Sequence, residues 1–256
     1  MAENGKITPL IETKGLKKEF ILEKGEKVTA LEGADVQIFD KEFVCLLGPS
    51  GCGKSTWLRI AAGLEHATEG EVLYKGEPVS SPGKERGMVF QEYSLLPWRS
   101  VADNVTLGPE FGGLSHRERK EVAADYLSRV GLENFANAKP HELSGGMRQR
   151  AAIARALAND PDVLLMDEPF GALDAHTRVI LQKELLKIWE QDRKTVVFVT
   201  HSVDEALYLA DRVVVMTAHP GRVLEEIKID FPRPRSRSAS GYGEMTERIF
   251  GLLESF

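Results

Sequence analysis

A glycine-rich segment, Gly48–Thr56, holds residue types suited to binding phosphate groups. It matches the phosphate-loop pattern G-x-x-x-x-G-K-[ST]. A short apolar run, Phe43–Leu47, precedes it as a predicted buried strand, and a predicted helix over Thr56–Gly63 follows it. That order of strand, loop and helix turns backbone N–H groups toward an anion at the start of the helix. We therefore predict that the segment binds a nucleoside triphosphate, rather than forming a chance glycine-rich turn.

The residues of this loop have separate predicted roles. Its glycines leave room for the backbone to curl around phosphates because they carry no Cβ. Lys54 is expected to reach the β- and γ-phosphates, and the Ser55 hydroxyl to ligate Mg²⁺. The helix N-terminus and Lys54 are expected to lower the pKa of the Cys52 thiol. The predicted nucleotide-binding residues are Gly48, Pro49, Ser50, Gly51, Cys52, Gly53, Lys54, Ser55 and Thr56.

Two adjacent carboxylates, Asp167 and Glu168, follow the apolar run Val163–Met166. Acidic residues at the end of a strand are usually only solvated. In a chain that also carries a phosphate loop, a carboxylate at this place can instead hold the hydration shell of Mg²⁺, and we assign that role to Asp167. Glu168 points differently, and we predict that it orients the water that attacks the γ-phosphate.

A second anion site is predicted where Ser144, Gly145 and Gly146 begin a helix, because exposed N–H groups lie at a capped helix N-terminus. Leu143–Arg150 reads L-S-G-G-M-R-Q-R, and here the chain resembles the ATPase subunits of ATP-binding cassette (ABC) transporters. The resemblance covers about residues 10 to 230, and its five short motifs occur in the expected order.

The resemblance implies further site residues at the matching positions. Phe20 matches the aromatic residue that stacks on adenine, although a Phe in an edge strand also suits a core. Gln91 matches the glutamine that touches Mg²⁺ and the attacking water. Asp174 matches the loop that contacts the opposite subunit, and His201 matches the histidine that contacts the γ-phosphate. The family more often has Ser where Gly171 stands, which leaves Asp174 unaffected.

The same resemblance implies how such subunits work. Two copies, or this chain and a paralogous ATPase subunit, face head to tail, and each ATP lies between Gly48–Thr56 of one and Ser144–Gly146 of the other. Phosphate charge between two helix N-termini favours the closed pair, and phosphate release removes that attraction. Polytopic membrane permease subunits are the expected partners, with a solute-binding protein acting indirectly.

A cluster of apolar residues, Leu95–Trp98, follows Gln91. Four large or rigid apolar residues in a loop-like segment either pack inside a helical lobe or form a partner surface. The resemblance favours the second interpretation, because cassette subunits hold a short cytoplasmic helix of the membrane subunit in a groove near this position.

The predicted fold is α/β: a P-loop NTPase core with a mostly parallel sheet, an N-terminal antiparallel β subdomain and an inserted helical subdomain. The segments expected are 1–91 for the β subdomain and first half of the core, 92–160 for the helical subdomain, and 161–230 for the second half of the core. Residues 231–256 are expected to form a Pro/Arg-rich extended linker and an amphipathic helix. The apolar face of that helix comprises Met245, Ile249, Leu252, Leu253 and Phe256.

Composition limits the kinds of partner and the cellular compartment that are expected for this protein. The chain has 256 residues, 42% of them hydrophobic, and its net charge of −6 argues against a general nucleic-acid surface. No apolar run reaches the length of a membrane span, and the first six residues lack the apolar segment of a secretory signal. Cys45 and Cys52 provide no disulfide framework, which fits a reducing compartment. The resemblance to transporter ATPase subunits then implies a peripheral position at the cytoplasmic face of a membrane.

Weaker sequence features indicate which kind of ABC protein this is. Leu95–Val105, Val214–Arg222 and Ile229–Arg235 resemble the importer group for nitrate, sulfonates, taurine and bicarbonate. We therefore expect an ATPase subunit of an importer for a small anion. Two alternatives remain: a soluble ABC ATPase of DNA repair or translation, and a regulatory subunit without turnover. The first usually has coiled-coil inserts or two cassettes, and this chain has neither. The presence of both Glu168 and His201 argues against the second.

Overall fold

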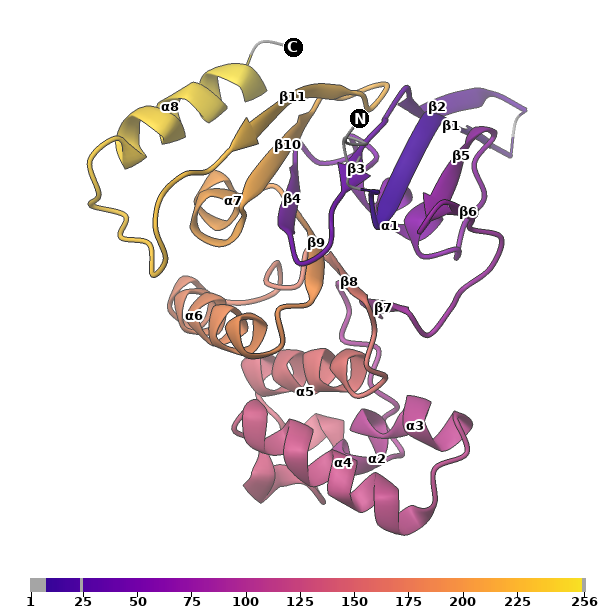
Figure 1. Ribbon diagram of the computed structural model, residues 1–256, viewed down its shortest axis with the longest axis vertical. Coiled ribbons are helices and arrows are strands. Elements are labelled where there is room, and N and C mark those ends of the chain that lie inside the picture. Colours follow the sequence, from indigo (N-terminus) through magenta and orange to yellow (C-terminus); the bar gives the residue numbers. More distant parts are fainter. Residues whose placement is uncertain (1–7, 24, 255–256) are drawn as a thin grey trace, which may run out of the picture. The chain divides into compact units, whose positions relative to one another are not determined.

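The computed structural model describes residues 8–23 and 25–254, which form two compact units (Figure 1). The first unit contains residues up to 82 together with residues 195 onward. The second contains residues 83–194. The N-terminal hexapeptide and Phe256, both used in the sequence predictions, lie outside the described residues.

An antiparallel sheet forms the N-terminal part of the first unit. Its strands are arranged in the order β2-β1-β5-β6, and β3 pairs with the start of β1. Leu16 and Ile38 are fully buried on this sheet, as the alternation of apolar and polar residues predicts. The strands are β1 (Ile11–Ile21), β2 (Lys27–Glu32), β3 (Gln37–Ile38), β5 (Glu69–Tyr74) and β6 (Glu77–Pro78).

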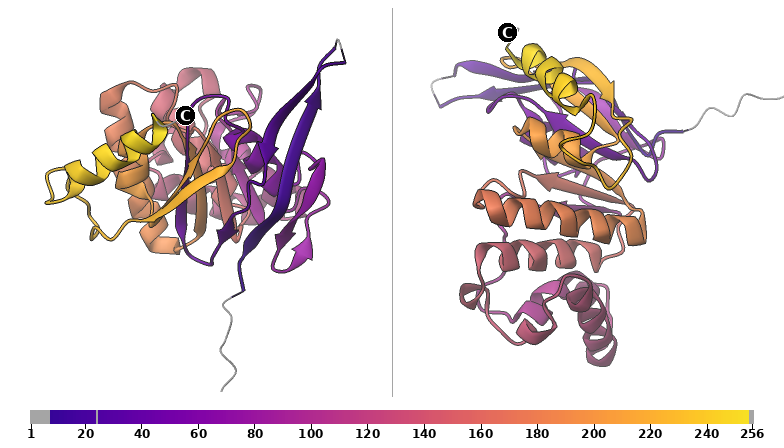
Figure 2. Two further views of the ribbon diagram at one scale, coloured as in Figure 1. Left: turned by 90° about the horizontal axis from the view of Figure 1, so that it is seen from above. Right: turned by 90° about the vertical axis from the view of Figure 1, so that its left-hand side faces the viewer.

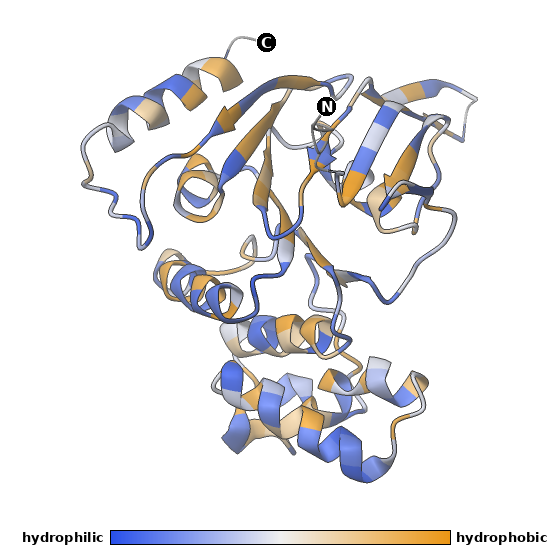
Figure 3. Ribbon diagram, in the orientation of Figure 1, coloured by the Kyte–Doolittle hydropathy of each residue, from blue (hydrophilic) through white to orange (hydrophobic). Residues whose placement is uncertain are grey.

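Parallel strands form the rest of the first unit's sheet structure. β4 lies between β9 and β10, parallel to both, and β11 adds to β10 in the antiparallel sense. Every residue of β4 and β9 is buried, and β4 and β10 are largely hydrophobic in colour in Figure 3, as expected for a sheet covered on both faces. The strands are β4 (Phe43–Leu47), β9 (Thr195–Thr200), β10 (Arg212–Met216) and β11 (Val223–Lys228).

Three helices belong to the first unit: α1 (Lys54–Ala61), α7 (Val203–Leu209) and α8 (Tyr242–Leu253). The C-terminal helix α8 packs against α7 and β10, as two views of the ribbon show (Figures 1 and 2). Ile249 is fully buried there, so the predicted amphipathic helix docks on this chain.

The second unit is mostly helical, with one parallel strand pair. Its strands are β7 (Arg86–Val89) and β8 (Val163–Asp167). Its α-helices are α2 (Val101–Val105), α3 (Leu107–Phe111), α4 (His116–Arg129), α5 (Gly145–Leu157) and α6 (Ala175–Asp192). Two short 3₁₀ turns complete it, η1 (Glu133–Phe135) and η2 (Pro140–Glu142).

The prediction of an extended linker over residues 231–240 is wrong. Arg235 is only 6% exposed and donates hydrogen bonds to four backbone carbonyls, so this stretch is packed against the first unit. Proline and arginine content predicted an extended linker, but it did not reveal the backbone carbonyls that the fold presents to this segment. No helix among the described residues is long and apolar enough to cross a membrane.

Candidate nucleotide-binding site

The phosphate loop connects β4 to α1, as predicted. Gly53 caps α1 with φ 90°, a left-handed conformation that favours glycine, and a Cβ there would lie 2.7 Å from the Ala30 carbonyl oxygen. A Cβ on Gly48 would lie 2.8 Å from the Met216 carbonyl oxygen. These glycines are therefore required for the loop to pass close to its neighbours, and α1 has no acidic residue in its first turn to repel an anion.

Lys54 lies folded over the loop from which it comes. It is 4% exposed, and its Nζ donates hydrogen bonds of 2.8 Å to the carbonyl oxygens of Gly48 and Pro49. The ammonium group is thus held above the loop that is predicted to cradle phosphates. Lys54 has both a structural contact and the charge needed for a phosphate ligand.

The pKa of the Cys52 thiol is shifted in the opposite direction from the one expected. The Lys54 ammonium lies 3.6 Å from its Sγ, but burial outweighs this cation and raises the pKa of the thiol. The predicted direction of the Cys52 pKa is therefore wrong. Cys45 is also a free, buried cysteine, and its pKa is likewise raised by burial.

His201 lies next to the phosphate loop through strand register. Leu47 and Thr200 are partners on the neighbouring parallel strands β4 and β9. The residues that follow them, Gly48 and His201, therefore emerge at the same edge of the sheet, about one strand spacing of 4.8 Å apart. His201 is exposed, as a side chain that contacts a nucleotide needs to be.

Phe20 lies near the end of β1 and is 38% exposed. The Lys18 ammonium lies 4.9 Å from the centre of its ring, and Val28, its partner on β2, is also exposed. A core position for Phe20, the alternative weighed from the sequence, does not fit this exposure. The ring offers an accessible flat surface of the kind that stacks on a base.

In the second unit, β8 ends at the two carboxylates. Asp167 is 3% exposed, whereas Glu168 is half-buried and has φ 41°. A positive φ on a non-glycine residue is strained, and such strain concentrates at functional sites. The two carboxylates thus differ in burial, and the backbone turns sharply between the strand and Glu168; their separate tasks stay a prediction.

Gln91 and Glu168 approach each other around Gly171. A Cβ at Gly171 would lie 3.7 Å from Glu168 Oε2 and 3.9 Å from Gln91 Nε2. These are ordinary van der Waals distances, so the Ser that the family more often carries here would fit in this position. The structure therefore brings together two of the predicted catalytic side chains, although 77 positions separate them in the sequence.

The Ser-Gly-Gly segment begins α5 as predicted. The Ser144 Oγ accepts a hydrogen bond of 3.3 Å from the Met147 backbone N–H, and Ser144 is exposed. A Cβ on Gly146 would lie 3.0 Å from Thr177 Cγ2, so glycine allows α5 to approach α6 closely. Gly145 is similarly crowded by Leu173 and Tyr93. The exposed helix start retains N–H groups that can bind an anion.

Asp174 is the N-cap of α6. Its carboxylate accepts hydrogen bonds from the backbone N–H groups of His176 and Thr177 and from the Thr177 hydroxyl. These hydrogen bonds lower the pKa of the Asp174 carboxyl, and the bond from the Thr177 hydroxyl has the largest effect. The structure thus gives this exposed residue a capping role, in addition to the intersubunit role that the resemblance implies.

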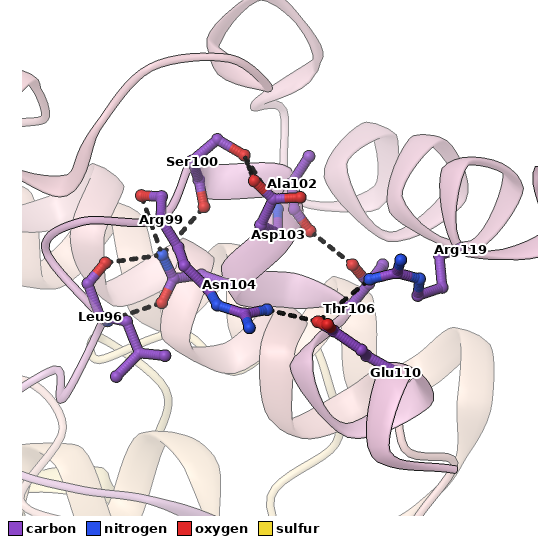
Figure 4. Close-up of polar contacts among 9 residues, drawn as sticks. All are labelled: Leu96, Arg99, Ser100, Ala102, Asp103, Asn104, Thr106, Glu110 and Arg119. Atoms are coloured by element: carbon purple, nitrogen blue, oxygen red, sulfur yellow. Dashed lines mark hydrogen bonds and ion pairs between the residues drawn. The ribbon is translucent and has the colours of Figure 1, made fainter. Parts of the chain in front are cut away.

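The Leu95–Trp98 segment is held by buried Asn104 (Figure 4). The Asn104 side chain accepts from Leu96 N–H at 2.7 Å, and it donates to the carbonyl oxygens of Leu96 and Ser100. Trp98 itself is 70% exposed. It therefore does not pack inside the helical lobe, which was the alternative considered from the sequence.

A groove of about 360 Å³ in the second unit was not predicted from the sequence. Its apolar lining includes Met88, Phe90, Leu107 and Phe111, and Phe111 is 83% exposed at the end of α3. Trp98 does not line it. An exposed Phe followed by two glycines was the available sequence signal, but exposure itself is a tertiary property.

The donors predicted for Mg²⁺ are Ser55, Gln91 and Asp167, all of them oxygen ligands of the kind that Mg²⁺ prefers. Among the described residues, no cluster of three or more His, Cys, Asp or Glu side chains can hold a metal.

Comparison with known proteins identifies relatives that match most of the chain. Residues 31–171 match the family model described as ABC transporter. An uncharacterized ABC transporter ATP-binding protein of Methanocaldococcus jannaschii is 56% identical over 90% of this chain and 86% of its own length. A taurine import ATP-binding protein of Rhizobium johnstonii is 49% identical over 92% and 93%, respectively. A nitrate import ATP-binding protein of Synechococcus elongatus is 48% identical over 87% and 82%.

Solved structures agree with these relatives. A dimeric bacterial ABC transporter cassette is 38% identical, with a TM-score of 0.76, and the match covers 86% of this chain and 98% of that one. The same cassette, in a post-hydrolysis state bound to ADP and Pi, matches with the same values. The predicted P-loop NTPase fold with its antiparallel N-terminal sheet is therefore confirmed.

Proposed function

The chain belongs to the ABC transporter family, and on that premise we propose that it is the ATP-hydrolysing subunit of an importer for a small anion. It is an ATPase of this family and binds ATP. The observation that carries the importer proposal is its 48–49% identity, over 87–92% of the chain, to import ATP-binding proteins for taurine and nitrate.

The site residues have the following proposed roles. Lys54 and the N–H groups of the phosphate loop bind the phosphates of ATP, and Phe20 stacks on adenine. Bound Mg²⁺ would neutralise phosphate charge, with Ser55, Gln91 and Asp167 as its protein donors. The strained turn at Glu168 aims that carboxylate at the attacking water, and His201 contacts the γ-phosphate from the sheet edge that it shares with Gly48.

ATP-driven pairing of two such subunits is part of the proposal. Ser144 is exposed at the start of α5, where the backbone N–H groups of the first helical turn can bind an anion. A nucleotide bound to one subunit is proposed to complete its contacts on Ser144–Gly146 of the other, head to tail. The dimeric cassette that this chain resembles supports such pairing.

The membrane partner is proposed to dock in the groove beside Phe111. Exposed apolar side chains that line a groove tend to mark partner surfaces, and a short helix is the element that such grooves accept. Polytopic permease subunits are the proposed partners, which places the chain peripherally at the cytoplasmic face of a membrane. A solute-binding protein would act only through those subunits.

Co-expression with candidate permease subunits from the same genome tests the proposal. The assembled complex, reconstituted in vesicles with its binding protein, is expected to take up labelled taurine, an alkanesulfonate or nitrate only when ATP is present on the side of this subunit. Phe111→Ala is expected to weaken assembly while ATP binding is retained. An ATPase that never co-purifies with a membrane protein and is unaffected by these solutes would contradict the importer proposal.

A further inference from the structure

The C-terminal stretch Phe231–Arg237 is bound along the whole of helix α7. At the C-terminal turn of α7, Arg235 donates to the carbonyl oxygens of Leu207 at 2.8 Å and Tyr208 at 3.2 Å. Arg233 donates to the carbonyl oxygen of Leu209, the last residue of the helix. The last carbonyls of a helix have no intrahelical partner, and a cation is favourable at that end. Two arginines therefore satisfy the C-terminus of α7.

The N-terminal turn of α7 is held by a third arginine. Arg237 makes a paired contact with the Asp204 carboxylate, with its Nη2 at 2.7 Å from Oδ2. Its guanidinium also lies 4.4 Å from the centre of the Tyr208 ring. An isolated helix of seven residues is unstable in water, so α7 depends on such contacts for its position.

His201 lies directly at the head of this helix. Thr200 Oγ1 donates to the buried Glu205 carboxylate and accepts from the Ser202 backbone N–H at 3.0 Å. Ser202, the N-cap, accepts in turn from the Glu205 N–H. Both neighbours of His201 are therefore fastened to the first turn of α7, and a displacement of the helix moves the backbone that carries the imidazole.

Among the three arginines, Arg235 is buried most deeply. Besides the two α7 carbonyls, it donates to the carbonyl oxygens of Ile229 and Phe231. These hydrogen bonds of Arg235 all go to backbone carbonyl oxygens. Burial lowers the pKa of its guanidinium to about 10. A buried cation is costly for a segment that only had to be attached to the surface, since apolar contacts would suffice.

We propose that Arg235 is a positioning residue for His201, which it holds in place through helix α7. This inference rests on the proposed catalytic role of His201. It gives the segment 231–237 a task in the ATPase reaction of this chain. Arg233 and Arg235 contact the C-terminal turn of α7, and Arg237 contacts its N-terminal turn, so the stretch is fastened to both ends of the helix.

The test is a double-mutant cycle in the full-length chain. Arg235→Met keeps the apolar length of the side chain and removes the guanidinium. We expect roughly a tenfold loss of kcat with KM for ATP changed less than about twofold, since a small misplacement of a catalytic group lowers the rate and not the binding. In a His201→Ala background, the same substitution is expected to change kcat by less than about twofold, because the residue through which it acts is absent.

Arg248→Met is the matched control. Arg248 lies on α8 and pairs with half-buried Glu225 of β11, so this variant removes an arginine of the same C-terminal region whose ion pair does not involve α7. Its kcat is expected to equal that of the wild-type chain. If Arg235→Met fails to fold, Arg235→Lys carries the test, with a smaller loss and the same dependence on His201.

Amide hydrogen exchange separates this inference from the proposed function. The N–H groups of α7 are expected to exchange faster in Arg235→Met than in Arg248→Met, whether or not the chain hydrolyses ATP. Unchanged exchange rates of the α7 amides would contradict the inference that Arg235 holds this helix in place. An equal loss of kcat in both His201 backgrounds would overturn the positioning role alone. A wild-type chain without ATPase activity would overturn the proposed function together with the catalytic role of His201 on which this inference rests, whereas hydrogen exchange would still report whether Arg235 holds α7.

Discussion

Trp98→Ala provides the sharpest test of the membrane-facing surface. The residue lies on a loop whose backbone is fixed by Asn104 and by the Lys139 Nζ, which donates to the Trp98 carbonyl oxygen at 3.0 Å. Removal of the side chain leaves these backbone contacts in place. The melting temperature of the isolated chain is therefore expected to be unchanged, as for surface substitutions that shift stability by about 0.5 kcal/mol or less.

The expected effect on assembly follows from exposure. A side chain that is 70% exposed offers about 175 Å² of a large aromatic's roughly 250 Å², and burial of that area at about 25 cal/mol per Å² sets an upper bound of about 4 kcal/mol. Association costs reduce this, and interface hot spots typically lose about 2 kcal/mol or more on truncation. We therefore predict that the dissociation constant of the complex between this chain and the permease subunits is about 30-fold higher for Trp98→Ala.

The assay is a titration of the permease complex in detergent or nanodiscs with labelled wild-type and variant chain. Phe135→Ala is the matched control, because Phe135 is a 40% exposed aromatic residue of the same unit that lies outside the Leu95–Trp98 segment. Its affinity is expected to stay near the wild-type value. Assembly of Trp98→Ala within about twofold of wild type, or a large drop in its melting temperature, would refute the reasoning.

Three further predictions concern the nucleotide site. Glu168→Gln keeps the shape of the side chain and removes the base, so ATP binding should persist while turnover falls at least about 10²-fold; turnover near the wild-type rate would contradict the assignment. Lys54→Ala should abolish tight ATP binding measured by calorimetry, and because Lys54 also donates to Gly48 and Pro49, a slightly lower melting temperature should accompany it. Since burial raises the pKa of Cys52, its thiolate is scarce at neutral pH, and alkylation by iodoacetamide should be slower than that of an unfolded control, faster as the pH rises and absent in Cys52→Ser. Rapid labelling at neutral pH would show that the thiol is not buried in solution.

The sequence alone determined those parts of the site that are contiguous in the chain. A phosphate loop and a capped helix start are local structures, built from residues within one turn of each other, so Gly48–Thr56 and Ser144–Gly146 could be recognised from spacing. The strand Phe43–Leu47 was likewise predicted with the bounds that the structure has, because a short apolar run beside turn residues is typical of a buried sheet.

Tertiary structure decided the features that depend on what surrounds a residue. The pKa of Cys52 has the opposite direction from the one predicted, because burial outweighs the charge of Lys54. Trp98 and Phe111 are exposed, although the sequence offers the same apolar side chains to a core or to a partner.

The arginine stretch shows the same limit most clearly. Phe231–Arg237 has the composition of a linker. Its sequence does not indicate that its arginines donate hydrogen bonds to the backbone carbonyls of Leu207, Tyr208 and Leu209. Those carbonyls are unsatisfied only because α7 ends there, and they are within reach only because β11 returns the chain beside that end. Local chemistry could therefore be predicted from the sequence, whereas burial and long-range hydrogen bonding arise only when distant segments are brought together.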